Sequence, residues 1–228
     1  MAEKILLSWS GGKDSALTLY ELQKSKNYEI IALITTITED YDRVSMHGIR
    51  RNLIEQQAES MGIKLENVLI SRNASNQEYE SKLCEVLLRY NELGINIVAF
   101  GDLFLEDIRR YREDFLKKIG IQAIFPIWKR TTSELAKTFL NLGFKAVISC
   151  VDSELIDKSF AGREFDEKFL SELPSKADPC GENGEFHSFV YEGPIFKNPI
   201  HYSRGEVVLR DNRFYFCDLI PNSRNIRS

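Results

Sequence analysis

The segment SGGKDS at residues 10–15 contains residue types that bind phosphate groups. Two adjacent glycines let backbone N–H groups approach an anion, and serine hydroxyls supply further donors. If a helix starts near Asp14, its first N–H groups point at the same place. The Asp14 carboxylate would repel a bare phosphate, so it indicates Mg²⁺ between the two groups. The segment therefore predicts a phosphate-binding loop. The plainer alternative is a strand-to-helix turn in which Ser10 and Asp14 are only caps.

The spacing within this segment excludes the two commonest nucleotide loops. A Walker A loop requires glycine, four residues, and then Gly-Lys-Ser or Gly-Lys-Thr. Here Asp14 follows Gly12-Lys13, and the residue five before Gly12 is Leu7. A GxGxxG dinucleotide fingerprint is absent as well. The loop must therefore serve a different phosphate chemistry.

The composition is ordinary for a soluble globular protein: of 228 residues, 43% are hydrophobic and 28% charged, and the formal net charge is -4. Nucleic-acid binding relies on basic faces, so no strong nucleic-acid signal is present, although a local basic patch stays open. No apolar run is long enough to cross a bilayer, and no signal peptide is recognisable. The four cysteines are widely spaced and form no CxxC, which argues against a zinc site or a disulfide framework. We therefore expect a cytoplasmic protein.

Four segments share a pattern that predicts alternating helices and strands. In each, a helix-period segment ends at a glycine, and a strand-like run begins at once. These glycines, expected to be left-handed helix C-caps, are Gly62, Gly94, Gly120 and Gly143. Capping-box patterns occur at Ser75 with Glu78 and at Thr131 with Glu134. With two earlier strand-like runs, about six βα units are expected over residues 3–155.

Short, largely apolar strands are typical of a sheet that is covered by helices on both faces. We therefore predict an α/β domain over residues 1–155 with an open, mostly parallel, doubly wound sheet. Ligands of such sheets bind beyond the carboxyl ends of the strands, near the switch point. After about residue 160 the pattern becomes irregular and then antiparallel, and Asp211-Asn212 could turn a hairpin. Residues 156–228 are expected to form a small C-terminal α+β subdomain that binds the substrate.

Residues 10–15 also resemble the SGGxDS signature of the PP-loop ATP pyrophosphatases. Members of this family split ATP between the α and β phosphates and leave AMP on the activated substrate. The resemblance implies an adenine nucleotide alpha hydrolase-like fold, with ATP and Mg²⁺ as cofactors. Several PP-loop reactions fit poorly, because the chain lacks the cysteines of thiolation enzymes, a basic RNA-binding extension and room for an amidotransferase domain.

Three further segments resemble the diphthine–ammonia ligase family of PP-loop enzymes. They are SMHGIRRNLIEQQAESMGI (residues 45–63), GDLFLEDIRRYREDFLKKIGIQAIFPIWKR (101–130) and CGENGEFHSFVYEGPIF (180–196). The third is the most specific, and Ser188 replaces the usual threonine while keeping the hydroxyl. The additional C-terminal domains of eukaryotic relatives have no counterpart, so we expect the single-module form.

The resemblance implies an AMP- and pyrophosphate-forming ligase that adenylates a carboxylate and amidates it with ammonia. In diphthamide biosynthesis the acceptor is diphthine on elongation factor 2, but the acceptor of this chain stays open. A homodimer also stays open. One alternative is a nucleotide-binding or sensor protein of the same fold without ligase turnover. Another is a related adenylating ligase with a different carboxylate substrate.

The resemblance further implies roles for individual residues. The expected catalytic residues are Lys13, Asp14, Glu182, Glu185 and His187. The expected ATP contacts are Ser8, Ser10, Gly11, Gly12, Lys13, Asp14, Ser15, Thr35, Met46, His47 and Gly101. The expected substrate contacts are Asp102, Trp128, Gly181, Glu182 and Glu185, and the expected metal ligand is Asp14.

Several of these residues also have a plainer interpretation. The carboxylates of the third block could be solvated loop residues, and His187 a surface strand residue, instead of a base or an ammonium pocket. His47 could simply pack, and Trp128 could belong to the core. Cys180 is expected to pack and not to act as a nucleophile, because no base lies at a recognisable spacing.

Overall fold

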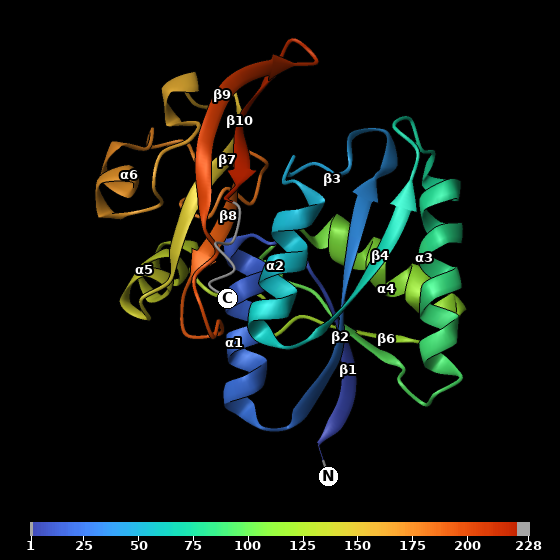
Figure 1. The fold of residues 1–228 in the computed structure, drawn as a ribbon. Helices are drawn as coiled ribbons and strands as arrows, with labels where there is room; N and C mark the ends of the chain where they lie inside the picture. Colours follow the sequence, from blue (N-terminus) through green and yellow to red (C-terminus); the bar gives the residue numbers. More distant parts are fainter. Residues whose placement is uncertain (1, 223–228) are drawn as a thin grey trace, which may run out of the picture.

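A computed structural model describes residues 2–222 as two β-sheets with helices between and outside them (Figure 1). The strands are β1 (Glu3–Ser8), β2 (Tyr28–Thr38), β3 (Arg43–Val44), β4 (Lys64–Ile70), β5 (Ile97–Ala99), β6 (Gln122–Ile124), β7 (Lys145–Asp152), β8 (Phe186–Glu192), β9 (Tyr202–Arg210) and β10 (Phe214–Pro221). The α-helices are α1 (Lys13–Ser25), α2 (Arg51–Met61), α3 (Asn76–Asn91), α4 (Glu106–Lys118), α5 (Thr132–Asn141) and α6 (Glu167–Glu172). Two short 3-10 helices are η1 (Glu39–Tyr41) and η2 (Lys158–Phe160).

The first sheet is the predicted parallel, doubly wound sheet. Its parallel strands lie in the order β4-β2-β1-β5-β6, and the short β3 pairs antiparallel with the end of β2. The chain winds outward from β1 in both directions, so the switch point lies between β1 and β5. Since ligands bind at such a point, the loop after β1 is in the predicted position.

Helices cover both faces of this sheet, and the residues of β1 alternate between the two cores. Ile5 and Leu7 belong to the core that contains α1 and α2, whereas Leu6 belongs to the core that contains α3 and α4. Because successive side chains of a strand point to opposite faces, this alternation explains why the strands are apolar throughout.

The second sheet is antiparallel, in the order β8-β7-β10-β9. The prediction that the strand at residues 145–152 closes a sixth unit of the parallel sheet is wrong, because β7 pairs with β8 and β10 instead. A short apolar run fits a central strand of either kind of sheet, so the sequence pattern could not distinguish them.

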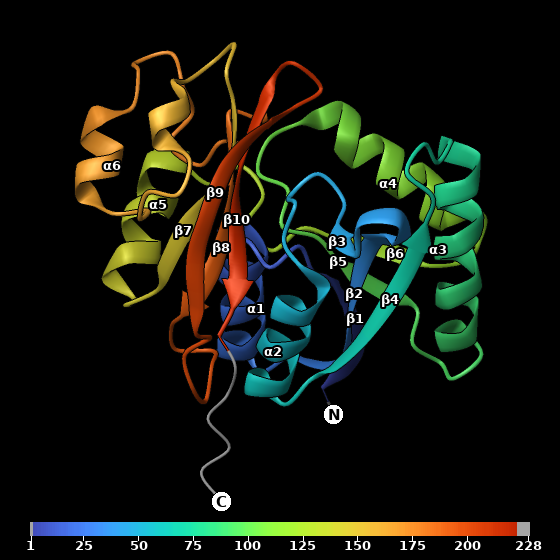
Figure 2. The same cartoon turned by 45° about the horizontal axis from the view of Figure 1, so that its top comes forward.

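Helices α1 and α2 lie between the two sheets, and α5 and α6 lie on the outer side of the second sheet (Figure 2). One hydrophobic core is continuous across this arrangement, joining residues of β1, α1 and α2 with residues of β7 and β8. The third sequence segment (residues 180–196) lies in β8 and the loops on either side of it, and β8 contacts helix α1.

The predicted helix ends are mostly confirmed. All four C-cap glycines have a positive φ. The Ser75 hydroxyl accepts a hydrogen bond from the Glu78 N–H, which is one half of the predicted capping box; the Glu78 carboxylate accepts from the N–H and hydroxyl of Ser71 instead of from the Ser75 N–H. The Thr131 side chain makes no such bond. There the backbone carbonyl oxygen of Thr131 accepts the Glu134 N–H at 3.0 Å, so the hydroxyl is not needed as an acceptor.

The predicted hairpin is also confirmed. Asp211 and Asn212 both have positive φ values, and they join the paired strands β9 and β10. Residues 223–228 of the predicted C-terminal subdomain lie outside the described residues. Among residues 2–222, no helix is long and apolar enough to cross a membrane.

Candidate active site

The candidate phosphate loop lies where β1 ends and α1 begins. Gly11 has a φ of +79°, and a Cβ at this position would collide with Ile54 and lie 2.9 Å from the Gln57 amide. Only glycine fits, because a side chain would be strained and would press into α2. The backbone can therefore turn sharply into α1, whose first N–H groups face the loop.

Serine hydroxyls line this loop. Ser10 Oγ accepts a hydrogen bond from the Gly12 N–H at 3.3 Å and lies 3.4 Å from Ser15 Oγ. Ser15 Oγ donates to the Gly12 carbonyl oxygen at 2.9 Å. Ser8 is the last residue of β1. The loop thus has the predicted donors, and their contact with ATP stays a prediction.

Lys13 and Asp14 form an ion pair at the start of α1. The Lys13 ammonium lies 2.8 and 3.1 Å from the two Asp14 oxygens and also donates to the carbonyl oxygen of Cys180. Burial acts to lower the pKa of Lys13, but the charge and hydrogen bond of Asp14, together with the charges of Cys180 and Glu182, outweigh it and raise that pKa. Burial raises the pKa of Asp14 in spite of Lys13. The loop therefore holds a lysine that stays charged.

Two histidines lie beside the loop. The ring centres of His47 and His187 are 4.3 Å apart, and a Cβ on Gly12 would lie 3.5 Å from the His47 ring. Burial and the Lys13 charge lower the pKa of His187 to about 4. Burial, His187 and Lys13 lower the pKa of His47 well below its ordinary value. Both rings are therefore neutral at pH 7, and His47 Nδ1 has no hydrogen-bond partner among the described residues.

Three other predicted ATP contacts have different surroundings. Thr35 is buried in β2, and within residues 2–222 its hydroxyl has no partner. A Cβ on Gly101 would lie 3.0 Å from the carbonyl carbon of Asp14, so the end of β5 closely approaches the first turn of α1. Met46 has a φ of +66° and is 72% exposed. Gly101 therefore adjoins the loop, Thr35 is buried in β2, and Met46 faces solvent.

Two predicted substrate contacts already have protein partners. The Asp102 carboxylate forms a two-point ion pair with Arg112, at 2.9 and 3.2 Å. The guanidinium carbon of Arg109 lies 4.9 Å from the centre of the Trp128 ring. Trp128 also packs against Phe125 and is half-buried. Both residues therefore belong to a cluster beyond the carboxyl ends of β5 and β6.

Glu182 links the third sequence block to the switch point. Its carboxylate accepts hydrogen bonds from the Leu103 N–H at 2.7 Å and the Phe104 N–H at 3.4 Å, just after β5. Burial raises the pKa of Glu182 to about 7, with the Asp14 charge acting in the same direction. Such a carboxyl group exchanges a proton near neutral pH, as a general base should.

Glu185 is fully enclosed by its own loop. Its oxygens accept hydrogen bonds from the Asp178 N–H at 2.8 Å, the Asn183 N–H at 3.0 Å and the Asn183 side-chain amide at 3.0 Å. The residue is 2% exposed. Because its acceptor positions are used locally, the geometry favours a role in shaping residues 178–185.

Gly181 and Cys180 belong to the same loop. Gly181 has a φ of +68°, and a Cβ there would lie 2.7 Å from the Phe186 carbonyl oxygen. Burial raises the pKa of Cys180 to about 12, and its thiol contacts the Thr132 carbonyl oxygen at 3.2 Å. A thiol of this kind is not a nucleophile at neutral pH, in agreement with the expected packing role.

Three contacts of the site were not predicted from the sequence. Ser188 Oγ accepts the Lys13 N–H at 3.2 Å, the Cys180 carbonyl holds the Lys13 ammonium, and Gln57 bonds to the loop carbonyl of Gly11. A carbonyl group leaves no trace in a sequence, and a glutamine in a polar helix is normally a surface residue. Of these three contacts, only the one from Ser188 could be suspected from the sequence, because Ser188 lies in the third segment that resembles the family.

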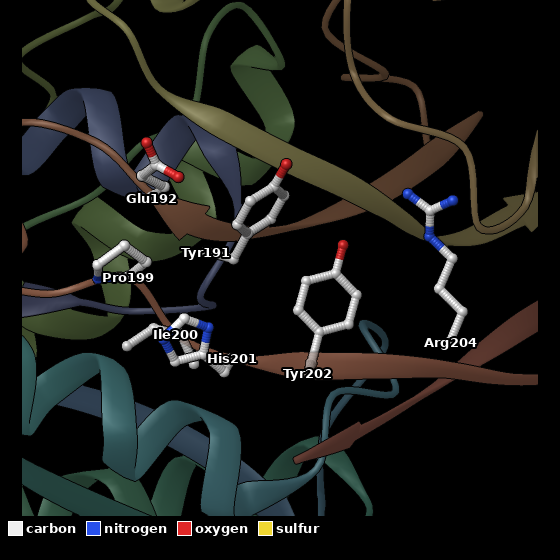
Figure 3. A pocket seen from close by; sticks show the side chains of 7 residues that line it. All are labelled: Tyr191, Glu192, Pro199, Ile200, His201, Tyr202 and Arg204. Atoms are coloured by element: carbon white, nitrogen blue, oxygen red, sulfur yellow. The ribbon is translucent and has the colours of Figure 1, made fainter. Parts of the chain in front are cut away.

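A surface hollow of about 420 Å³ lies away from these residues, near the start of β9 (Figure 3). Its lining residues are Tyr191, Glu192, Pro199, Ile200, His201, Tyr202 and Arg204. The Tyr191 hydroxyl donates to Glu164 at 2.9 Å, and Arg204 also pairs with Glu164. The hollow contains none of the predicted site residues.

The fold and the loop together define a class: an α/β protein with a glycine-rich, lysine-bearing loop at the switch point of a doubly wound sheet. Residues 3–123 match the family model described as diphthamide synthase N-terminal domain, and residues 131–218 match that of the diphthamide synthase C-terminal domain. The chain belongs to the diphthamide synthase family. The resemblance to this family predicted from the sequence is confirmed.

Curated relatives are similar over most of this chain. The diphthine–ammonia ligase of Schizosaccharomyces pombe is 26% identical over 225 residues, which are 90% of this chain and 37% of that protein. The chain thus spans little more than a third of the yeast protein's length. The diphthine–ammonia ligase of Homo sapiens is 26% identical over 226 residues, 88% of this chain and 83% of that protein.

Two solved structures are weakly similar. One is a predicted subunit of a tRNA methyltransferase from Methanocaldococcus jannaschii, with a TM-score of 0.41, 18% identity, and coverage of 63% of this chain and 77% of that one. The other is the U34-tRNA thiolase NcsA from Methanococcus maripaludis, with a TM-score of 0.36, 19% identity, and coverage of 62% and 57%.

Proposed function

We propose that this protein is an ATP-dependent ligase that adenylates a carboxylate and amidates it with ammonia, as the name diphthine–ammonia ligase describes for its relatives. The observation that carries the proposal is the SGGKDS loop at the switch point, with the charged Lys13 on one side and Glu182 nearby. A nucleotide-binding protein without turnover is not favoured by the names of these relatives.

ATP would bind with its phosphates at the loop. The Gly12 N–H, the hydroxyls of Ser10 and Ser15 and the Lys13 ammonium would contact the phosphate oxygens. Thr35, His47 and Gly101 would border the rest of the nucleotide, and these contacts stay proposals. Lys13 would stabilise the charge that develops on pyrophosphate as it leaves.

Asp14 is the proposed Mg²⁺ ligand. Among residues 2–222, no group of three His, Cys, Asp or Glu side chains could hold a metal ion. Mg²⁺ in nucleotide enzymes is commonly held by one or two carboxylates plus the substrate phosphates, so a single half-exposed carboxylate at the loop fits that mode. When bound there, Mg²⁺ would neutralise phosphate charge.

The chemistry balances in two steps. A carboxylate oxygen attacks the α-phosphorus of ATP, an acyl-adenylate forms, and pyrophosphate leaves. Ammonia then attacks the acyl carbon, AMP leaves with the carboxylate oxygen, and the nitrogen releases one proton to solvent to give the amide. Ammonium must lose a proton before it attacks, and we assign this proton to Glu182. His187, with its pKa of about 4, is a much weaker base at neutral pH.

Product analysis tests the proposal. The protein is incubated with ATP, Mg²⁺, ammonium and a panel of carboxylates that includes diphthine on elongation factor 2. We expect AMP and pyrophosphate in equal amounts, and only when ammonium and an accepted carboxylate are both present. ADP as the main product would contradict the proposal. ATP binding without turnover on any acceptor would favour the nucleotide-binding alternative.

The C-terminal subdomain is proposed to bind the acceptor. Since β7 belongs to the second sheet, we place the boundary between the subdomains in residues 125–144, earlier than the expected 155. The gap between the two matched family domains, residues 124–130, lies at the same place. The location in the cytoplasm and the homodimer stay predictions.

A further inference from the structure

Gln57 of helix α2 is fully buried and connects three separate parts of the molecule. Its side-chain nitrogen donates to the carbonyl oxygen of Gly11 at 3.1 Å and to that of Val190 in β8 at 2.6 Å. Its side-chain oxygen accepts the indole N–H of Trp9 at 2.9 Å. Because an indole N–H can only donate, the Trp9 contact fixes which end of the amide faces the loop.

The Gly11 carbonyl is held from two directions. Besides Gln57, the backbone N–H of Val190 donates to the same oxygen at 2.9 Å. A trans peptide unit is planar, so its C=O and its N–H point to opposite sides. With the Gly11 oxygen held toward α2 and β8, the Gly12 N–H must point the other way, toward the Ser10 hydroxyl and the mouth of the loop.

We propose that Gln57 is a positioning residue for nucleotide binding: it fixes the Gly11–Gly12 peptide so that the Gly12 N–H faces a bound triphosphate. The inference rests on the proposed binding of ATP at this loop. It adds a residue outside the glycine-rich signature, and it makes the loop's geometry depend on β8 of the second sheet. The Gln57 amide thereby adds a second link between this loop and β8, beside the direct bond from the Val190 N–H to the Gly11 carbonyl oxygen.

The matched variants are Gln57→Met and Ser60→Ala. Methionine keeps the length of the side chain but removes both donors, so the Gly11 carbonyl keeps only the Val190 bond. Ser60 lies one turn further along α2, and its hydroxyl also ties α2 to the C-terminal part, through the Asn198 carbonyl oxygen at 2.6 Å. Ser60→Ala therefore removes an α2 contact of the same kind without touching the loop.

Calorimetric titration with ATP and Mg²⁺, well below the unfolding temperature of each variant, tests the inference. We expect Gln57→Met to weaken ATP binding about ten- to hundredfold, the effect of misplacing one hydrogen bond to a charged group. Ser60→Ala should keep the wild-type affinity. Equal affinities of wild type and Gln57→Met would overturn the inference. If the wild type itself does not bind ATP, the proposed function fails first, and the inference fails with it.

A second variant separates positioning from a general loss of stability. In Gln57→Glu an ionised carboxylate would face two carbonyl oxygens, whereas a protonated one can donate to one of them. Because burial and the two facing carbonyl oxygens raise the pKa of this carboxyl group, the ATP affinity of Gln57→Glu relative to wild type should fall at least fivefold as the group ionises between pH 6 and pH 10. If the affinity of Gln57→Glu relative to wild type does not change with pH, the positioning role is overturned. This test does not require Gln57→Met to fold.

Discussion

At the scale of single residues, the carboxyl groups of the third block have different surroundings. Glu182 accepts two backbone N–H groups next to the switch point, and burial raises its pKa to about 7. Glu185 is enclosed by its own loop. Environment, not residue type, therefore favours Glu182 as the base and Glu185 as a structural residue.

We predict that Glu182→Gln lowers amide formation by about 10²–10⁴-fold, the range of general base catalysis. The rate of the wild type should rise with pH around 7, where this carboxyl ionises, and the variant should lose that limb. Rates measured from pH 5.5 to 8.5 check both statements. Glu167→Gln, on the exposed surface of α6, is the control. A variant that keeps the full rate and the same pH profile excludes Glu182 as the base.

The same pKa has a consequence for stability. Because burial raises the pKa of Glu182 from 4.5 to about 7, the folded protein binds this proton more tightly than the unfolded chain. Proton binding by Glu182 therefore adds to the free energy of unfolding. This addition is complete below about pH 4.5 and is lost as the pH rises to about 7. Urea unfolding of wild type and Glu182→Gln should therefore show the variant gaining stability relative to wild type across this window. A difference that does not change with pH would contradict the raised pKa.

Glu185→Gln should act on folding. Glutamine would turn an NH₂ group toward a backbone or side-chain donor, so one buried hydrogen bond becomes a donor–donor contact. We expect a loss of about 1–3 kcal/mol in the free energy of unfolding. Urea unfolding at pH 7 measures it. An unchanged stability together with a large loss of turnover would return Glu185 to the catalytic residues.

At the scale of elements, the segment between β3 and α2 (residues 45–50) packs against β10. A Cβ on Gly48, which has a φ of +68°, would collide with the Phe216 ring. The His47 carbonyl oxygen accepts the Ser149 hydroxyl at 3.1 Å, and this bond joins the segment to β7 as well. The His47 side chain thus reaches the phosphate loop because the second sheet holds its backbone.

Gly48→Ala and its control Gly94→Ala test how tightly this segment packs against β10. Both glycines have a positive φ, but a Cβ on Gly94 would meet nothing within 4 Å. Gly94→Ala should cost about 1–2 kcal/mol for the backbone alone. Gly48→Ala should cost about 1–3 kcal/mol more because of the clash with Phe216. Thermal or urea unfolding distinguishes the two, and equal losses would show that the segment moves freely on β10.

The elements also show what a sequence can predict. Helix ends with glycine, the Asp211-Asn212 hairpin and the strands of the first sheet depend on local conformation and periodicity, and these predictions hold. The sheet to which β7 belongs depends on its partners, which lie far away along the chain. The buried position of the Gln57 side chain likewise depends on its hydrogen bond to Val190, which lies 133 residues away in the sequence. Such long-range pairings were beyond local patterns.

At the scale of the whole molecule, one carboxylate joins the two sheets. Asp218 of β10 pairs with Arg43 of β3 at 2.9 Å and with Arg50, which precedes α2, at 2.7 Å. The hydrogen bond from Arg50 is the main cause that lowers the pKa of Asp218, and Arg43 adds to it. Together with Gln57, these two ion pairs connect the two sheets on either side of the loop.

Asp218→Asn should weaken this junction. The lowered pKa contributes stability that is present above the ordinary aspartate value near 4 and is lost as the pH falls. The groups are partly exposed, so we expect a loss of about 1 kcal/mol at pH 7 and a smaller loss at pH 2.5. Urea unfolding at both pH values checks this. Asp42→Asn, whose carboxylate lies 3.6 Å from Arg51 and is 69% exposed, is the control with little effect.

The most direct test of the whole account follows the oxygen atoms of the acceptor. An accepted carboxylate labelled with ¹⁸O is converted by the protein with ATP, Mg²⁺ and ammonium, and the AMP is analysed by mass spectrometry. Since the carboxylate oxygen that attacks the α-phosphorus leaves with AMP, we predict one ¹⁸O atom in each AMP. Unlabelled AMP, or label in phosphate released together with ADP, would contradict adenylation of the carboxylate at this loop.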